Sequence, residues 1–347
     1  MKYSIRPLNI NNIEIYEENK LFPRSYFIPY KSRKKLDKTN ALTNRYKSDT
    51  VKVLSGKWDF CFFNKISEMP REFDTDALAF DKINVPSTWQ RTGYANPKYI
   101  NTRYEHPMTL PNVPEEMNAG IYRKIFTLSK ECVNPIITFL GVCSSLTLYV
   151  NGKYVGYSEG SHNSAEFCLK DFVSEGENEL VAIVTQWCNG SYLECQDMFR
   201  EKGIFRDVYI TENPAEYIYD YLINTKKVEE GYILSVDCEL KGENLSGKKI
   251  TAELNYNGKT VGKVESAAAS KVTLALAPID AVEWNAEKPE LYNFYLTLSD
   301  GENDIQVARN KIGFKTVEIK GEKFLFNGRL IKFKGVTIMI HIILTAM

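Results

Sequence analysis

Short segments in which apolar and polar residues alternate are the feature of this sequence that most restricts its fold. They read IYRKIFTL at residues 121–128, and SLTLYV and KYVGY on either side of Asn151-Gly152. A period of two residues is typical of strands. An Asn-Gly pair favours a hairpin, because both positions of its turn need positive φ angles. No long amphipathic helical period occurs in the sequence, and we therefore predict an all-β chain.

A second run of strand-like segments follows Pro214. About seven strands at turn-punctuated spacing over roughly 100 residues are typical of an immunoglobulin-like sandwich. Residues 1–48 differ, because they are polar, weakly patterned and basic between Lys31 and Lys38. We expect them to form an arm that packs on the rest. The segments of the second run are YILSVDCEL (232–240), KKITAELNYN (248–257), KTVGKVE (259–265), KVTLALA (271–277), ELYNFYLTLSD (290–300) and DIQVARNKIGF (304–314).

The charge balance argues against two classes of partner. Lys and Arg number 44, Asp and Glu also number 44, and the formal net charge is zero. This balance gives no support for binding to nucleic acid or to a membrane surface. The first 20 residues are polar and lack the apolar run of a secretory signal, and the seven cysteines include no C-x-x-C pair. We expect a cytoplasmic protein with free thiols.

The chemistry-bearing residues concentrate in one segment. The three histidines are far apart, and no G-x-S-x-G, phosphate-loop or dinucleotide motif occurs. Residues 187–207, in contrast, mix aromatic rings with Glu194, Gln196, Asp197 and several other charged side chains. Aromatic faces beside hydrogen-bonding groups suit sugars. The same composition also fits a buried ion-pair network that ties a long loop to a sandwich, and both interpretations remain open at this point.

The segment SYLECQDMFREKGIFRDVYI (191–210) resembles the signature segment of the β-galactosidases of glycoside hydrolase family 2. Further stretches resemble the same family and occur in the same order as in that family. Several matches in order are stronger evidence of a resemblance than one isolated motif. These stretches are LFPRSYFIPY (21–30), LSGKWDF (54–60), VPSTWQRTGY (85–94), YINTRYEHP (99–107), NAGIYRKIF (118–126), 139–167, WNAEKPELYNFYLTL (284–298) and 313–336.

The resemblance implies a domain order. After an N-terminal arm (1–48), residues 49–212 would form a jelly-roll, galactose-binding-like sandwich of the sugar-binding type. An immunoglobulin-like sandwich would follow at 213–312, and 313–336 would contain only the first strand of a (β/α)₈ TIM barrel. Such a barrel needs about 250 residues. Both catalytic glutamates of the family lie in the barrel, so no residue of this chain is assigned a catalytic role.

The resemblance also suggests two site residues. Asp197 matches an aspartate that contacts a galactose hydroxyl and helps to hold a monovalent cation. Asn101 matches a substrate-contacting asparagine, although a turn residue is an equal alternative. The full-length family enzymes hydrolyse terminal β-D-galactosides such as lactose with retention, use Mg²⁺ and a monovalent cation, and form homo-oligomers. Cys143 and Cys195 stand where many relatives carry acidic residues.

Other functions remain open on the sequence alone. A jelly roll with exposed aromatic and acidic side chains suits a non-catalytic carbohydrate-binding module, and the chain could also be an assembly fragment that supports a barrel supplied by another chain. A β-glucuronidase or β-mannosidase of the same family is a nearer alternative. The segments 21–30 and 196–198 favour a β-galactosidase.

The last residues, Thr337–Met347, resemble no part of the family. The codons AAC CAT CAT GAT ACA CAT CAT encode Asn-His-His-Asp-Thr-His-His, the kind of segment that the family carries there. Loss of one A gives ACC ATC ATG ATA CAC ATC AT, which encodes the sequence of Thr337–Ile343. A natural domain end with an apolar tail is the alternative.

We predict that Thr337–Met347 are out of frame, from a one-base deletion in the gene or in its sequencing, and that reading the DNA around codon 337 will show barrel-coding sequence downstream. An intact frame followed by no such sequence in any frame would contradict this prediction.

Overall fold

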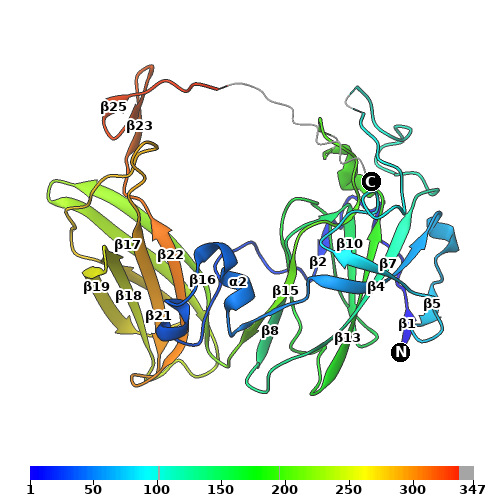
Figure 1. Ribbon diagram of the computed structural model, residues 1–347, viewed down its shortest axis with the longest axis horizontal. Helices are drawn as coiled ribbons and strands as arrows, with labels where there is room; N and C mark the ends of the chain where they lie inside the picture. Colours follow the sequence, from blue (N-terminus) through cyan, green and yellow to red (C-terminus); the bar gives the residue numbers. More distant parts are fainter. Residues whose placement is uncertain (101, 195, 336–347) are drawn as a thin grey trace.

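Two β-sandwiches lie side by side, with part of the N-terminal arm between them (Figure 1). The computed structural model describes residues 1–100, 102–194 and 196–335. Strands pair in antiparallel fashion within both sandwiches. Strand is the dominant secondary structure, so the predicted all-β fold is confirmed. Within these residues, no helix has the length and apolar character needed to cross a membrane.

The first sandwich packs a seven-stranded sheet on a four-stranded one. In spatial order the larger sheet consists of β2 (Glu17–Glu18), β11 (Lys153–Ser158), β10 (Ser145–Val150), β13 (Glu177–Thr185), β7 (Ala119–Thr127), β4 (Gly56–Phe63) and β6 (Asp81–Val85). The smaller sheet consists of β12 (Ala165–Cys168), β8 (Asn134–Phe139), β15 (Val208–Asn213) and β3 (Val51–Val53). Two short pairs lie beside them, β1 (Lys2–Ser4) with β5 (Glu72–Asp74), and β14 (Gly203–Ile204) with β9 (Val142–Cys143).

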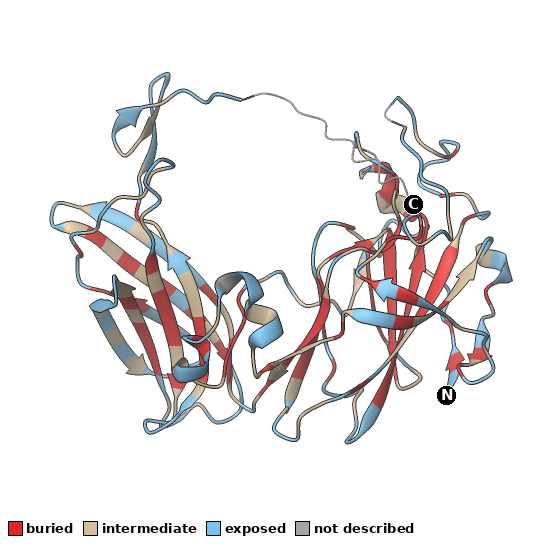
Figure 2. Ribbon diagram, viewed as in Figure 1, coloured by how far each residue is buried: buried red, intermediate tan, exposed pale blue. Residues whose placement is uncertain are grey.

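The predicted hairpin is present between β10 and β11. Asn151 and Gly152 have φ angles of 51° and 78°, the positive values that a type I′ turn requires. All six residues of β10 are nevertheless buried, although strict alternation predicts one solvated face (Figure 2). The outer face is covered because the β1–β5 pair places Tyr3 and Phe73 against Tyr149.

The second sandwich contains seven strands in two sheets. Its apolar core lies between the sheets and includes Leu234, Leu254 and Phe294, each of which is fully buried. The three-stranded sheet has the order β16 (Tyr217–Val228), β17 (Gly231–Lys241) and β20 (Lys271–Ala275). The four-stranded sheet has the order β19 (Lys259–Ala267), β18 (Lys249–Tyr256), β21 (Tyr292–Ser299) and β22 (Asp304–Ile312).

The remaining elements are short. Within the segment expected to lead into a barrel, a three-stranded antiparallel sheet projects from the second sandwich (Figure 1). The strands of this sheet are β23 (Val317–Lys320), β24 (Lys323–Phe326) and β25 (Arg329–Leu330). The α-helices are α1 (Arg33–Leu36) and α2 (Asn44–Lys47), and the 3₁₀ helices are η1 (Ala41–Thr43), η2 (Ile66–Glu68) and η3 (Asn189–Tyr192).

One arginine of the arm contacts both sandwiches and forms a buried ion pair with the first. The Arg24 guanidinium donates to both carboxylate oxygens of Glu166 in β12, with Nε–Oε2 and Nη2–Oε1 distances of 2.6 and 2.9 Å. Its Nη1 also donates to the carbonyl oxygen of Tyr219 in β16, at 3.3 Å. The two charged side chains are only 9% and 12% exposed. A bidentate pair of this kind fixes orientation as well as distance.

We expect Arg24→Ala to lower the free energy of unfolding by about 3 kcal/mol, because it leaves the Glu166 carboxylate buried without its counter-charge. Urea denaturation followed by tryptophan fluorescence measures this change. Lys249→Ala, which removes an exposed partner of Glu265, serves as the control and should leave the midpoint unchanged. An Arg24→Ala midpoint equal to that of the control would contradict the prediction.

Candidate functional site

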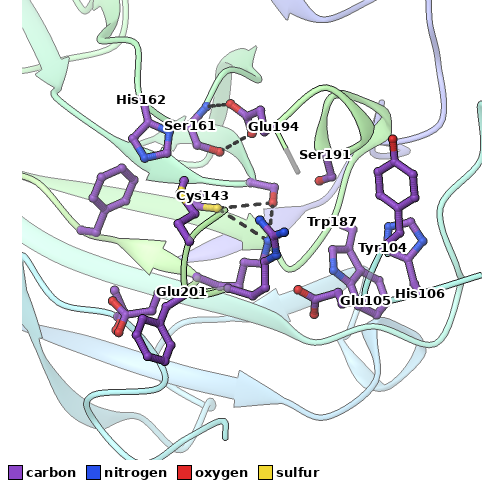
Figure 3. A pocket seen from close by; sticks show the side chains of 17 residues that line it. Tyr104, Glu105, His106, Cys143, Ser161, His162, Trp187, Ser191, Glu194 and Glu201 are labelled. Carbon is purple, nitrogen blue, oxygen red and sulfur yellow. Dashed lines mark hydrogen bonds between the residues drawn. The ribbon is translucent and has the colours of Figure 1, made fainter. Parts of the chain in front are cut away.

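A pocket of about 200 Å³ opens at one end of the first sandwich, beyond the ends of β6, β11 and β13 (Figure 3). Aromatic rings form much of its lining, and the His106 and Trp187 rings lie 4.7 Å apart between centroids. Ring faces of this kind stack on apolar surfaces, and the polar groups among them can fix a ligand's orientation. The aromatic lining residues are Tyr104, His106, His162, Trp187, Phe199 and Phe205.

The short β9–β14 pair places a lysine and a cysteine together in this lining. Gly203 pairs with Cys143, and the preceding residue, Lys202, donates to Ser144 Oγ at 3.3 Å and lies 3.7 Å from Cys143 Sγ. Gly203 has a φ angle of 122°, and a Cβ atom there would lie 3.0 Å from the Tyr122 hydroxyl. The positive φ angle and this close approach both favour glycine at the position.

Two carboxylates in the neighbouring loops are occupied by structural contacts. Glu194 accepts hydrogen bonds from both the backbone N–H and the hydroxyl of Ser161, each at 2.6 Å (Figure 3). Glu159 accepts from the Tyr157 hydroxyl at 2.6 Å and from the Gly190 N–H at 3.0 Å. Burial raises the pKa of Glu159 above its ordinary value, although both of these hydrogen bonds oppose the shift. These contacts tie the loop after β11 to η3.

A third carboxylate, at the end of the 187–207 segment, has a similar role. Asp207 accepts hydrogen bonds from Arg45 Nε and from the Ser55 hydroxyl, both at 3.0 Å. Arg206 donates to the backbone carbonyl oxygen of His162 at 2.9 Å. For these residues, the interpretation of the segment as a network that ties a long loop to the sandwich is therefore supported. Asp197 has a different environment.

Asp197 is exposed, and the Tyr99 hydroxyl donates to its Oδ1. The adjoining backbone holds the same two segments together. Arg200 donates through its backbone N–H to the Lys98 carbonyl oxygen at 2.9 Å, and through Nη2 to that of Ile100 at 2.7 Å. The structure thus places the Gln-Asp-Met segment beside residues 98–100, which are about 100 positions away in the sequence.

Asn101, the other predicted site residue, lies outside the described residues. Its neighbour Ile100 is held by Arg200, and both Met198 and Phe199 line the pocket. The two segments that carry the predicted site residues therefore meet at the border of the pocket. Asp197 itself is not among the residues that line it.

Two buried nitrogen atoms in the lining lack hydrogen-bond acceptors within the described part of the chain. They are Trp187 Nε1 and Arg200 Nε, on side chains that are 7% and 8% exposed. Unpaired buried donors are uncommon in folded proteins. Sequence reasoning singled out the segment that contains both residues, but it did not identify either as a candidate ligand-binding group. It also missed Lys202, whose partner Cys143 comes from a strand about 60 residues earlier.

The metal-binding capacity of the site is small in the described part of the chain. No group of three His, Cys, Asp or Glu side chains there could hold a metal ion. Asp197 presents an exposed carboxylate, and alkali and alkaline-earth cations prefer oxygen ligands of this kind. The described residues therefore fit one ligand of a cation site rather than a complete site.

Comparisons with known proteins match both sandwiches. Residues 51–214 match the model "Glycosyl hydrolases family 2, sugar binding domain", and residues 216–315 match the model "Glycosyl hydrolases family 2". A β-galactosidase of Actinobacillus pleuropneumoniae is 36% identical over 338 residues, which cover 95% of this chain and 30% of that protein. A β-galactosidase of Kluyveromyces lactis is 32% identical over 366 residues, covering 95% of this chain and 34% of that protein.

The chain thus spans about a third of the length of these two relatives. Among solved structures, a β-glucuronidase of Ruminococcus gnavus superposes with a TM-score of 0.59 at 19% identity, over 81% of this chain and 48% of that one. A β-glucuronidase of Bifidobacterium dentium gives a TM-score of 0.60 at 20% identity, over 82% of this chain and 51% of that one. These structures show the shared fold. The two matching domain models, which together span residues 51–214 and 216–315, establish that the chain belongs to glycosyl hydrolase family 2.

Proposed function

We propose that this chain is the N-terminal part of a retaining β-galactosidase, which hydrolyses terminal β-D-galactosides such as lactose. The observation that carries the proposal is the 36% identity to a β-galactosidase over 95% of the chain. Identity of this extent runs through both sandwiches and the loops between their strands. The β-glucuronidases, at 19–20% identity, support the fold alone.

In this proposal the chain contributes substrate contacts and not the catalytic pair. Asp197 has an exposed carboxylate, and its Oδ2 makes no hydrogen bond within the described part of the chain. A galactose hydroxyl is a suitable donor to that oxygen. Asn101 is the second proposed contact, because its segment lies beside that of Asp197. A monovalent cation would take Asp197 as one of its ligands and neutralise charge near the sugar.

Retaining hydrolysis needs an acid and a nucleophile whose carboxyl groups are about 5–5.5 Å apart. Two carboxylates in and beside the pocket, Glu194 and Glu159, are occupied by structural hydrogen bonds. Glu194 is bound through both oxygens to Ser161, and Glu159 is bound to Tyr157 and Gly190. We therefore propose that the two catalytic glutamates, the Mg²⁺ site and the homo-oligomer contacts belong to the full-length enzyme.

A second candidate function is carbohydrate binding without catalysis. The aromatic lining of the pocket favours this function, because aromatic rings can stack on the CH faces of a sugar without any catalytic residue. This candidate requires saturable binding of a galactoside by the chain itself. An assembly fragment would instead show activity only after a barrel-containing chain is added.

We expect the purified chain to show no turnover of a chromogenic β-galactoside above that of a heat-denatured sample, because neither catalytic carboxyl group is assigned to it. Calorimetric titration with methyl β-D-galactoside should likewise give no saturable heat. Asp197→Ala is the test variant, and Asp300→Ala, at a distant turn of the second sandwich, is its matched control.

Turnover that Asp197→Ala abolishes and Asp300→Ala retains would contradict the assignment of the catalytic pair to the rest of the enzyme. Saturable binding without turnover would instead favour the carbohydrate-binding module. A chain that becomes active on addition of a barrel-containing fragment would support assembly.

A further inference from the structure

Lys202 carries a buried charge that no carboxylate neutralises in the described part of the chain. Its side chain is 7% exposed, and its two hydrogen-bond partners are the neutral Ser144 hydroxyl at 3.3 Å and the Cys143 sulfur at 3.7 Å. An unpaired ammonium is unfavourable in such an environment. The nearest group that can develop negative charge is the sulfur of Cys143.

Cys143 differs from most of the other cysteines. Burial raises the pKa of the Cys132 and Cys238 thiols to about 12, and it also raises those of Cys61 and Cys188. These four thiols stay protonated at neutral pH and are weak nucleophiles. Of the other two free cysteines that the structure describes, Cys168 is exposed and Cys143 is half-buried in the lining of the pocket.

The pocket around Cys143 also offers unmatched donors. Trp187 Nε1 and Arg200 Nε are buried in its lining without acceptors. The lining contains three carboxylates: Glu194 is bound to Ser161, Glu105 accepts a hydrogen bond from Gln186 Nε2 at 3.3 Å, and Glu201 lies 3.6 Å from the Arg91 guanidinium. Besides these carboxylates, the lining contains the Cys143 thiol, an ammonium with no carboxylate partner among the described residues, and two buried N–H groups without acceptors there.

This combination fits a ligand that carries a carboxylate and reacts with a thiol. A carboxylate can accept several hydrogen bonds and neutralise Lys202. The cavity of about 200 Å³ has room for one arm of such a molecule. We propose that Cys143 is a site of mixed-disulfide formation with an anionic low-molecular-mass disulfide, whose carboxylate arm is held by Lys202, Arg200 and Trp187.

The reaction is a thiol–disulfide exchange. The Cys143 sulfur attacks one sulfur of the small disulfide after losing its proton to solvent, and a new S–S bond forms. The original S–S bond breaks, and the other half of the molecule leaves as a thiolate that takes up a proton. Cys143 is oxidised and the leaving half is reduced, so no further oxidant is needed. The product fills the pocket with a negatively charged group that a reducing thiol removes.

The test compares two disulfides of opposite charge on the native chain. Glutathione disulfide is anionic and cystamine is cationic, and peptide mass spectrometry measures the rate of adduct formation at each cysteine. We expect Cys143 to react about tenfold faster with glutathione disulfide, because Lys202 attracts the anion and repels the cation at close range. Cys168 lies on the surface of the same chain and serves as the internal reference, with no such preference.

Two variants separate charge from packing. Lys202→Met should lower the glutathione adduct rate at Cys143 about tenfold and leave Cys168 unchanged, whereas Lys202→Arg should retain the preference for the anion. If Lys202→Met does not fold, the ratio of the two adduct rates at Cys143 of the native chain is sufficient to test the proposal. Equal rates for both disulfides at Cys143, or a rate at Cys143 below that of Cys168, would overturn the proposal.

Discussion

Burial of apolar side chains between two sheets is the constraint on which the rest of this structure depends. In the first sandwich, Trp58, Phe60 and Tyr122 occupy the space between the sheets and are almost fully buried. Part of the outer face of the larger sheet is also covered, by the short β1–β5 pair. The strands therefore have little surface left for polar chemistry, and the candidate site lies in the loops at one end.

Those loops are long, and much of their polarity is used to hold them in place. The carboxylates of Glu159, Glu194 and Asp207 accept two or more hydrogen bonds each from neighbouring segments. Each such contact satisfies a backbone N–H or a side-chain donor that would otherwise be unpaired. What remains for ligands is a smaller set, formed by the Asp197 carboxylate and by the donors of Trp187, Arg200 and Lys202.

The two parts of the site have opposite electrostatic character. Asp197 offers negative charge at an exposed position, which suits sugar hydroxyls and cations. Lys202 and Arg200 offer positive charge in a buried pocket a few residues further along the chain, which suits a carboxylate. The Lys202 ammonium has the Cys143 thiol beside it and no carboxylate partner among the described residues. This pairing is the physical basis of the proposed disulfide exchange.

The sequence by itself determined the all-β fold, the hairpin at Asn151-Gly152 and the segment that contains the site, because period-two alternation and turn residues are local properties. The segment's match to a known family pointed to Asp197. Only the tertiary structure decided which polar residues of that segment are structural, because their partners, such as Ser55 and Ser161, come from distant positions. The same holds for the contact between Cys143 and Lys202, which depends on strand pairing across 60 residues of sequence.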